Sequence, residues 1–429
     1  MMTDDPAHVL RSLDAGAIPV RREGHHAAPD GDIVPSTVAV TAMAEHPEWR
    51  VALDRVVRET MRGAPGPPDL VVAFVSSAWS AEYPQLVAEL RAATCAATVV
   101  GCSTGGVIGD GREVEGAPAI SLLAGWMPGA LLHPVRLTQE RLALLDDSGD
   151  GGLWGDLDPA AVRSWLVLSE PFRFDVQALL DVMTAQFPGV PVIGGLTSGR
   201  HDERTGWIFF DGQVYDEGAV ALAIGGDIRL APMVAHGCDP IGQTWTVTGA
   251  ERNVLRSISN RPATAMMHDA LATVPAERQA WASRNLVLGI AADEYRDAFH
   301  RGDFLLRGVI GVDEAAGTLV IGGVPRVGQT VQFHVRDGET ATIDLVQSLT
   351  DVQATLGGQT LLGGILFDCI SRGTAMFGAP HHDISLIRAA FGDLPVMGGF
   401  AGGEIGPTGR RNGLHAFTAT LALLVHEPA

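Results

Sequence analysis

The sequence predicts an α/β fold, a mixed-sheet α/β sandwich built from repeated strand-helix-strand units and divided into two domains. The chain has 429 residues, too many for one ordinary core, and 46% of them are hydrophobic. Three stretches, at about 71–106, 165–199 and 361–404, share one plan of apolar strand, amphipathic helix and Gly-rich turn. Their strands are continuously apolar, which is typical of strands buried on both faces of a sheet. The repeated plan indicates internal duplication.

We divide the chain into a flexible tail at 1–37, an N-terminal α/β domain at 38–250 and a C-terminal α/β domain at 251–427. The tail is polar and carries no regular apolar pattern. A helix is expected after residue 46, and the Pro- and Gly-rich segment at 64–68 ends it.

The first domain contains two of the repeated units, and each is followed by a further apolar strand, at 119–124 and at 219–224. In the second unit, Asp175 is placed to cap a helix whose apolar side chains recur at helical spacing. The acidic, Gly-rich segment at 138–160 is expected to be a loop.

The pattern changes between the second and third units. A helix is expected at 266–274, strands at 286–291 and 305–312, and a hairpin turn at 313–317. These signals predict an antiparallel insertion or the start of the second domain. The third unit then leads to a final apolar strand at 419–425.

The formal net charge of −20 argues against nucleic acid and anionic membranes as partners, because Lys and Arg supply most of the affinity for both. The four cysteines form no CxxC pair, so neither a disulfide framework nor a zinc ribbon is indicated. No segment has the pattern of a signal peptide, and no run approaches the roughly 18 apolar residues of a spanning helix. We therefore expect a cytoplasmic protein without membrane insertion.

A ligand site is expected at the carboxyl ends of the strands, where the Gly-rich turns lie. The guanidinium of Arg372 could bind a ligand carboxylate and lower the pKa of the Cys369 thiol. Alternatively, the cysteine is a core residue and the arginine belongs to a surface ion pair. Glu404 could bind a ligand amine or be a solvated loop carboxylate. The predicted ligand-binding residues are Cys102, Ser103, Thr104, Gly194, Gly195, Thr197, Ser198, Cys369, Arg372, Gly373, Gly398, Gly399 and Glu404.

Two other kinds of functional site, a catalytic site and a haem site, are alternatives. The stretch 101–105 matches the GxSxG pattern of a nucleophile elbow, but that motif needs a helix directly after the serine and more glycines follow here. An enzyme that uses Ser103 or Cys369 is one alternative. The other is non-covalent haem, because the chain has no CxxCH motif. The candidate haem ligands are His236, His268 and His415.

These motifs together resemble the FIST family, in which an N-terminal FIST domain is followed by a C-terminal one. The resemblance covers most of the chain from about residue 40 to 425. The matching stretches include Val100-Gly-Cys-Ser-Thr-Gly105, Pro191-Val-Ile-Gly-Gly195, His236-Gly-Cys-Asp-Pro-Ile-Gly242, Phe367-Asp-Cys-Ile-Ser-Arg-Gly373 and Gly398-Gly-Phe-Ala-Gly-Gly-Glu404.

The resemblance implies a sensory role in signal transduction rather than a reaction. It implies binding of a small ligand such as an amino acid, and in some members a haem that senses nitric oxide for a partner kinase. We therefore expect a cytoplasmic sensory protein, not an enzyme, that binds an amino acid or similar small carboxylate. Its expected partner is a separate signalling protein such as a histidine kinase or cyclase. A haem-based nitric oxide sensor and a cysteine- or serine-dependent enzyme are the alternatives.

Overall fold

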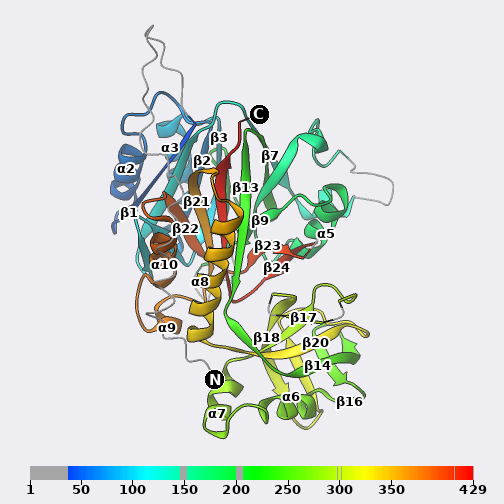
Figure 1. Ribbon diagram of the computed structural model, residues 1–429. Helices are drawn as coiled ribbons and strands as arrows, with labels where there is room; N and C mark the ends of the chain where they lie inside the picture. The colour runs from blue at the N-terminus through cyan, green and yellow to red at the C-terminus, as the bar shows by residue number, and fades with distance from the viewer. Residues whose placement is uncertain are drawn as a thin grey trace.

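The computed structural model describes residues 37–144, 152–199, 206–296, 298–300, 302–409 and 411–428. Except for Thr37, the tail predicted at 1–37 lies outside the described residues. The predicted mixed α/β fold is confirmed: helices cover mixed sheets in the larger part of the molecule, and a smaller lobe with an all-antiparallel sheet lies below it (Figure 1).

The first repeated unit forms the centre of a six-stranded sheet. In it β2 (Leu70–Ser76) runs parallel to β3 (Thr98–Thr104), and α3 (Tyr83–Thr94) makes the crossover. The helix expected after residue 46 is α2 (Trp49–Thr60), which packs with α3 against one face (Figure 1). The remaining strands are β1 (Val38–Glu45), β6 (Ala119–Trp126), β10 (Ile208–Phe210) and β11 (Gln213–Tyr215). The sequence did not predict β1, which pairs along its length with β6.

The second unit forms another six-stranded sheet around β8 (Val162–Ser169) and β9 (Val192–Leu196), which are parallel. The predicted cap is confirmed, because the Asp175 carboxylate accepts a hydrogen bond from the Ala178 amide at 3.0 Å at the start of α5 (Val176–Gln186). The other strands are β7 (Ala130–Leu137), β12 (Ala219–Gly226), β23 (Glu404–Thr408) and β24 (Arg411–His415). The described part of the expected loop at 138–160 contains the short helix α4 (Gln139–Ala143) and the first residues of the 3-10 helix η3 (Pro159–Ala161).

The third unit pairs β21 (Thr360–Cys369) in parallel with β22 (Val396–Ala401). Helices α8 (Gly338–Thr355) and α10 (His382–Phe391) cover the outer face of this sheet (Figure 1). Its other strands are β4 (Gly106–Gly109), β5 (Arg112–Glu115), β13 (Ile228–His236) and β25 (Thr418–His426).

Two of these three sheets, those around β8 and β21, combine strands from both halves of the sequence. The hairpin β4–β5 pairs with β22, β13 pairs with β25, and β9 pairs with β23. Side chains of all three sheets meet in one central core, where the rings of Phe74 and Phe367 pack edge to face with centroids 5.5 Å apart. The halves are therefore interlocked through backbone pairing as well as through apolar contacts.

Residues 238–336 form a separate antiparallel lobe between β13 and α8 (Figure 1). We call it the barrel lobe, because β14 pairs with both β20 and β15 and so closes the sheet on itself. The predicted strand at 286–291 and the hairpin turn at 313–317 are confirmed. The elements are β14 (Cys238–Glu251), β15 (Val254–Ile258), β16 (Arg261–Pro262), α6 (Ala263–Leu271), α7 (Ala276–Arg284), β17 (Leu286–Ala291), β18 (Phe304–Asp313), β19 (Thr318–Ile321) and β20 (Thr330–Arg336).

Candidate functional site

The three Gly-rich turns come together in space, although they are far apart in the sequence. The amide of Ser198 donates to the carbonyl of Ser103 at 3.1 Å. The amide of Gly105 lies 2.8 Å from the Ser198 hydroxyl and 3.3 Å from the carbonyl of Phe400. The amide of Gly402 in turn donates to the carbonyl of Leu196 at 3.1 Å. Backbone and small side chains therefore join the ends of β3, β9 and β22 directly.

A glycine at the same place in each unit explains the repeated motif. Gly101, Gly194 and Gly398 lie directly opposite a residue of the parallel partner strand. A Cβ atom at any of them would overlap the backbone carbonyl of that residue. These glycines are required for close strand packing, which accounts for their presence without a ligand.

The small polar residues of the turns are mostly used in packing. The Ser103 hydroxyl donates to the carbonyl of Ser198 at 3.1 Å and accepts from the amide of Trp207 at 3.0 Å. No histidine contacts this hydroxyl among the described residues, and β4 rather than a helix follows it, so the nucleophile elbow is absent. Thr104 and Thr197 have buried hydroxyls without a hydrogen-bond partner among the described residues.

A surface cavity of about 400 Å³ opens at the outer end of these turns. Its lining includes Gly105, Glu115, Gly199, Ile370 and Phe400. None of the predicted ligand-binding residues lines this cavity. Cys102, Ser103, Thr104, Gly194, Gly195, Thr197, Ser198, Gly398 and Gly399 lie behind it in the strands and turns.

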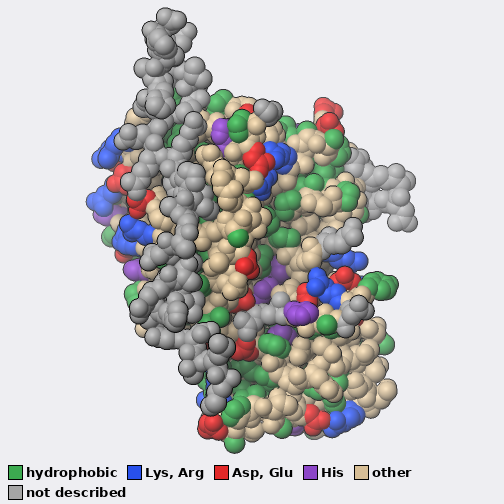
Figure 2. All heavy atoms as spheres, viewed as in Figure 1, with side chains coloured by type: hydrophobic (Ala, Val, Ile, Leu, Met, Phe, Trp, Pro, Cys, Tyr) green, Lys and Arg blue, Asp and Glu red, His purple; other side chains and the backbone are tan. Residues whose placement is uncertain are grey.

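The predicted residues of the third unit belong to a second arrangement, which we call the buried polar cluster: Cys369, Arg372, Glu404, His415 and Thr418. Each of the five is at most 4% exposed. They come from the end of β21 and the loop after it, from β23 and β24, where Glu404 and His415 are a directly opposed pair, and from the start of β25. The cluster lies near the junction with the barrel lobe, where Figure 2 shows histidine and acidic side chains gathered.

Glu404 is the acidic member of the cluster. Its Oε2 accepts hydrogen bonds from the amide and the hydroxyl of Thr418, at 3.1 and 2.8 Å. No hydrogen bond to its Oε1 is present among the described residues. Burial raises the pKa of Glu404 to about 8, against the lowering influence of Thr418, the Cys369 thiol and Arg372. The side chain is therefore mostly protonated at neutral pH.

The Cys369 thiol does not have the character of a catalytic nucleophile. Its Sγ lies 3.1 Å from the hydroxyl of Ser371. Burial, followed by the neighbouring charge of Glu404, raises the pKa of the thiol to about 12. This is opposite to the lowering by Arg372 that the sequence suggested, because burial is the largest influence on the pKa of this thiol.

Arg372 is fully buried rather than part of a surface ion pair. Its Nε and Nη2 atoms donate to the two carboxylate oxygens of Asp383 at 2.6 and 3.0 Å, and Nε lies 3.0 Å from Asp368. Its Nη1 has no partner among the described residues and faces Gly237, where a Cβ would lie 3.1 Å away. Gly373, at φ +77°, packs against the carboxylate of Glu115. Only one nitrogen of the guanidinium is therefore open to a ligand.

Sequence reasoning missed the carboxyl groups that hold this arginine. Burial tends to raise the pKa of Asp383, but the charge and hydrogen bonds of Arg372 hold it below its usual range. Burial and the charge of Asp383 raise the pKa of Asp368 well above its usual value. One signal was available, since Asp368 is the only charged residue in the apolar run of β21.

The candidate haem ligands are not arranged around a common site. His268 is on the surface of α6, with Nε2 3.2 Å from Glu314. His236 and His415 are buried, and their rings pack edge to face with centroids 5.4 Å apart. The His415 Nε2 lies 3.1 Å from the Thr408 hydroxyl and 3.2 Å from a backbone carbonyl. These contacts leave no room for a porphyrin plane between the two rings, so this arrangement does not fit haem.

His415 is nevertheless suited to bind something smaller. A carbonyl oxygen only accepts hydrogen bonds, so the Nε2 atom next to it carries the proton and Nδ1 presents a lone pair. Burial and the neighbouring His236 lower the pKa of His415 to about 3, so the ring is neutral. Its Nδ1 has no hydrogen-bond partner among the described residues.

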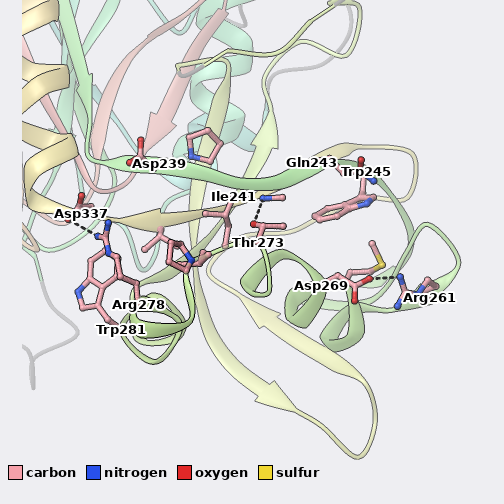
Figure 3. Close-up of a pocket in the computed structure, with 16 residues that line it drawn as sticks. Asp239, Ile241, Gln243, Trp245, Arg261, Asp269, Thr273, Arg278, Trp281 and Asp337 are labelled. Atoms are coloured by element: carbon pink, nitrogen blue, oxygen red, sulfur yellow. Dashed lines mark hydrogen bonds and ion pairs between the residues drawn. The ribbon is translucent and has the colours of Figure 1, made fainter. Parts of the chain in front are cut away.

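A second cavity, of about 700 Å³, lies in the barrel lobe between β14 and β20 on one side and α6 and α7 on the other (Figure 3). The predicted ligand-binding residues do not line it. Across the described residues, no group of three or more His, Cys, Asp and Glu side chains is arranged to hold a metal ion. Nor does the described part of the chain contain a helix long and apolar enough to cross a membrane.

Comparison with known proteins assigns most of the chain to one family. Residues 69–261 match the FIST N domain and residues 263–407 match the FIST C domain. A Mycobacterium tuberculosis protein described as uncharacterized is 35% identical over 373 residues, which are 86% of this chain and 94% of the relative. A Mycobacterium bovis protein with the same description is 34% identical over 332 residues, covering 77% of this chain and 83% of the relative. The matched regions meet between residues 261 and 263, and the division predicted at 250/251 stays a prediction.

Proposed function

Because the chain belongs to the FIST family, whose domains are sensory modules of signal transduction, we propose that it senses a small carboxylate such as an amino acid at the buried polar cluster. The ligand would bind near the junction between the sandwich and the barrel lobe. Catalysis is not part of this proposal, because burial raises the pKa of the Cys369 thiol and no histidine contacts the Ser103 hydroxyl among the described residues.

The observation that carries the proposal is a set of three buried polar atoms in one cluster: Arg372 Nη1, Glu404 Oε1 and His415 Nδ1. None of the three has a hydrogen-bond partner among the described residues. Buried polar atoms are normally paired, since an unpaired one costs about 1–3 kcal/mol. A bound small molecule would supply the missing partners.

The polarity of these atoms matches an amino acid. Arg372 Nη1 donates, and protonated Glu404 can donate from Oε1, so both can bind a ligand carboxylate. The lone pair of His415 Nδ1 can accept from a ligand ammonium group. Gly237 packs closely against the guanidinium, since a Cβ there would lie only 3.1 Å from Nη1.

The test is calorimetric titration of the full chain with the standard amino acids and small carboxylates at pH 7. Glu404→Ala should weaken binding of the active compound at least tenfold. Glu404→Gln should bind nearly as the wild type does, because the amide is a neutral donor in the same place. Glu113→Gln is the matched control, since Glu113 is also a buried carboxyl with an unpaired Oε2 but lies outside the cluster. Unchanged affinity in Glu404→Ala would overturn the assignment.

We further propose that the protein is cytoplasmic and passes its signal to a separate histidine kinase or cyclase. The acidic net charge of −20 supports a protein partner over nucleic acid. Ligand-dependent co-purification with candidate kinases would test this. Glu404→Ala is the control, because this variant should no longer bind the ligand.

A further inference from the structure

We propose that the cleft of the barrel lobe is a second binding site, for a small organic amine with a flat apolar body. The proposal is independent of the buried polar cluster. It depends on the shape of the cleft, on how β14 forms it, and on the charges at its two ends.

The cleft has the size of a small-molecule site. Its volume is about 700 Å³, within the range of roughly 300–1,000 Å³ that is usual for ligand pockets. The apolar floor includes Ile241, Val335 and Pro275. Figure 3 shows Ile241 between two charged ends, with Trp245 beside one end and Trp281 at the other.

An irregularity in β14 forms the cleft. Ile241 pairs with Phe333 and Trp245 with Val331, so three residues of β14 oppose one residue of β20. Gly242, at φ +67°, lies within this bulge, and a Cβ there would lie 2.8 Å from the indole of Trp245. Bulges of this kind often redirect side chains next to functional sites. Here the bulge places the indole in the lining of the cleft.

One end of the cleft brings two carboxylates together. The hydroxyl of Thr340 lies 2.6 Å from an oxygen of Asp239 and 3.1 Å from one of Asp337. Arg278 lies 3.7 Å from Asp337, a long ion pair, and its guanidinium stacks over Trp281 at 4.5 Å (Figure 3). This arginine is 53% exposed and is free to turn outward. An ammonium group could then replace it between the carboxylates and the indole face.

The opposite end is electrically balanced, because Arg261 and Asp269 form an ion pair at 2.5 Å (Figure 3). The lining as a whole has three aspartates and two arginines, so it carries an excess negative charge. That excess lies at the end with Asp239 and Asp337. A ligand with its cation there and its apolar body toward Trp245 satisfies both charge and shape, whereas an anion of the same shape does not.

The experiment titrates the full chain with three probes of matched shape: phenethylamine, phenylacetate and 2-phenylethanol. Calorimetry at pH 7 should detect binding of phenethylamine, with phenylacetate at least tenfold weaker. Trp245→Leu and Asp337→Asn should each weaken phenethylamine binding at least fivefold. Asp54→Asn, which removes an exposed carboxylate of another ion pair, should leave it unchanged. Thermal melting of each variant establishes that it is folded.

Three outcomes would overturn the proposal. Absence of phenethylamine binding at millimolar concentration excludes an amine site. Equal affinity for phenylacetate shows that the cleft does not select a cation. Binding that is lost in Glu404→Ala but kept in both Trp245→Leu and Asp337→Asn places the amine at the buried polar cluster instead.

Discussion

Glu404 links the chemistry of the cluster to the stability of the protein. Its pKa is raised to about 8 from an ordinary value of 4.5, so between these pH values the folded chain keeps a proton that the unfolded chain has lost. The contribution of this residue to stability is therefore fully present below pH 4.5 and is lost as the pH rises through about 8. The free energy of unfolding should fall by up to about 1.4 kcal/mol per pH unit in this window.

Urea denaturation at pH 5, 6, 7 and 8 measures this slope. Other groups titrate as well, so the informative quantity is the difference between the wild type and Glu404→Gln, which cannot ionise. The free energy of unfolding of the variant should change less with pH than that of the wild type. Identical slopes would mean that Glu404 is ionised in the folded state, and the donor role proposed for it would fail.

Cysteine accessibility separates the sensory proposal from a thiol enzyme. Cys95 is exposed, while Cys102, Cys238 and Cys369 are buried. Burial raises the pKa of each of the three buried thiols. Iodoacetamide at pH 7 should therefore label one thiol in the native protein and four in denaturant, counted by mass spectrometry. Rapid native labelling of Cys369 would support the enzyme alternative.

For individual residues, the sequence predicted some of the spatial neighbours in the buried polar cluster and missed others. Cys369, Arg372 and Glu404 were expected together because strand ends in α/β sheets meet at one edge. Glu113 was out of reach, because it contacts the start of α10 from 271 residues away and only the folded chain brings them together. The sequence also could not show which of these side chains are buried. Because they are buried, Arg372 binds Asp383 and the Cys369 thiol stays protonated.

Replacing Arg372 therefore tests the fold before it tests ligand binding. Removal of the guanidinium would leave Asp368 and Asp383 buried without their cation. Breaking a buried pair in this way typically costs about 3–5 kcal/mol. For this reason Glu404, and not Arg372, is the residue to vary when affinity is the question.

Among the elements, the parallel strand pairs have the most stringent packing. Gly194→Ala would place a methyl group onto the backbone carbonyl of Val167 in the neighbouring strand, so either the pair must separate or the turn must move. We expect a loss of about 3 kcal/mol in the free energy of unfolding. The control is Gly66→Ala, because no atom lies within 4 Å of a Cβ at that position.

Chemical denaturation of the two variants checks this expectation. The control should change stability by less than about 0.5 kcal/mol. Equal stability of both variants would show that β8 and β9 can relax apart without cost. The Gly-rich turns would then need an explanation other than strand packing.

Elements of the three repeated units were predicted, whereas many outside them were not, including α8 with 18 residues and β14 with 14. The strands of the three units and the amphipathic helices carry enough apolar residues to define a period. Strands β1, β4 and β5 were missed because β1 alternates weakly and the other two have four residues each. Pairing between β4 and β22 is a tertiary event, and the sequence carries no local signal for it.

At the scale of the whole molecule, strand exchange makes the two halves dependent on each other. A fragment of residues 1–262 would leave β4, β9 and β13 without β22, β23 and β25. Unpaired strand edges favour aggregation. We expect this fragment alone to aggregate or to melt without a cooperative transition, as measured by circular dichroism and size exclusion.

Co-expression with residues 263–429 supplies the missing strands and is the control. It should give a soluble complex that melts near the temperature of the full chain. A lone 1–262 fragment with a cooperative transition at that same temperature would show that the first half completes its own sheets. The exchange would then contribute little to stability.

The pairing of β4–β5 with β22 also means that, in the cell, the hairpin is synthesised long before the strand with which it pairs. The hairpin ends at Glu115 and its partner strand begins at Val396, about 280 residues later. Ribosomes add about 5–20 residues per second, so the hairpin waits roughly 15–60 s for its partner. Throughout that interval its open edge is available to other chains. The rate at which the second half is translated, rather than the stability of the finished protein, determines how long each new molecule is exposed.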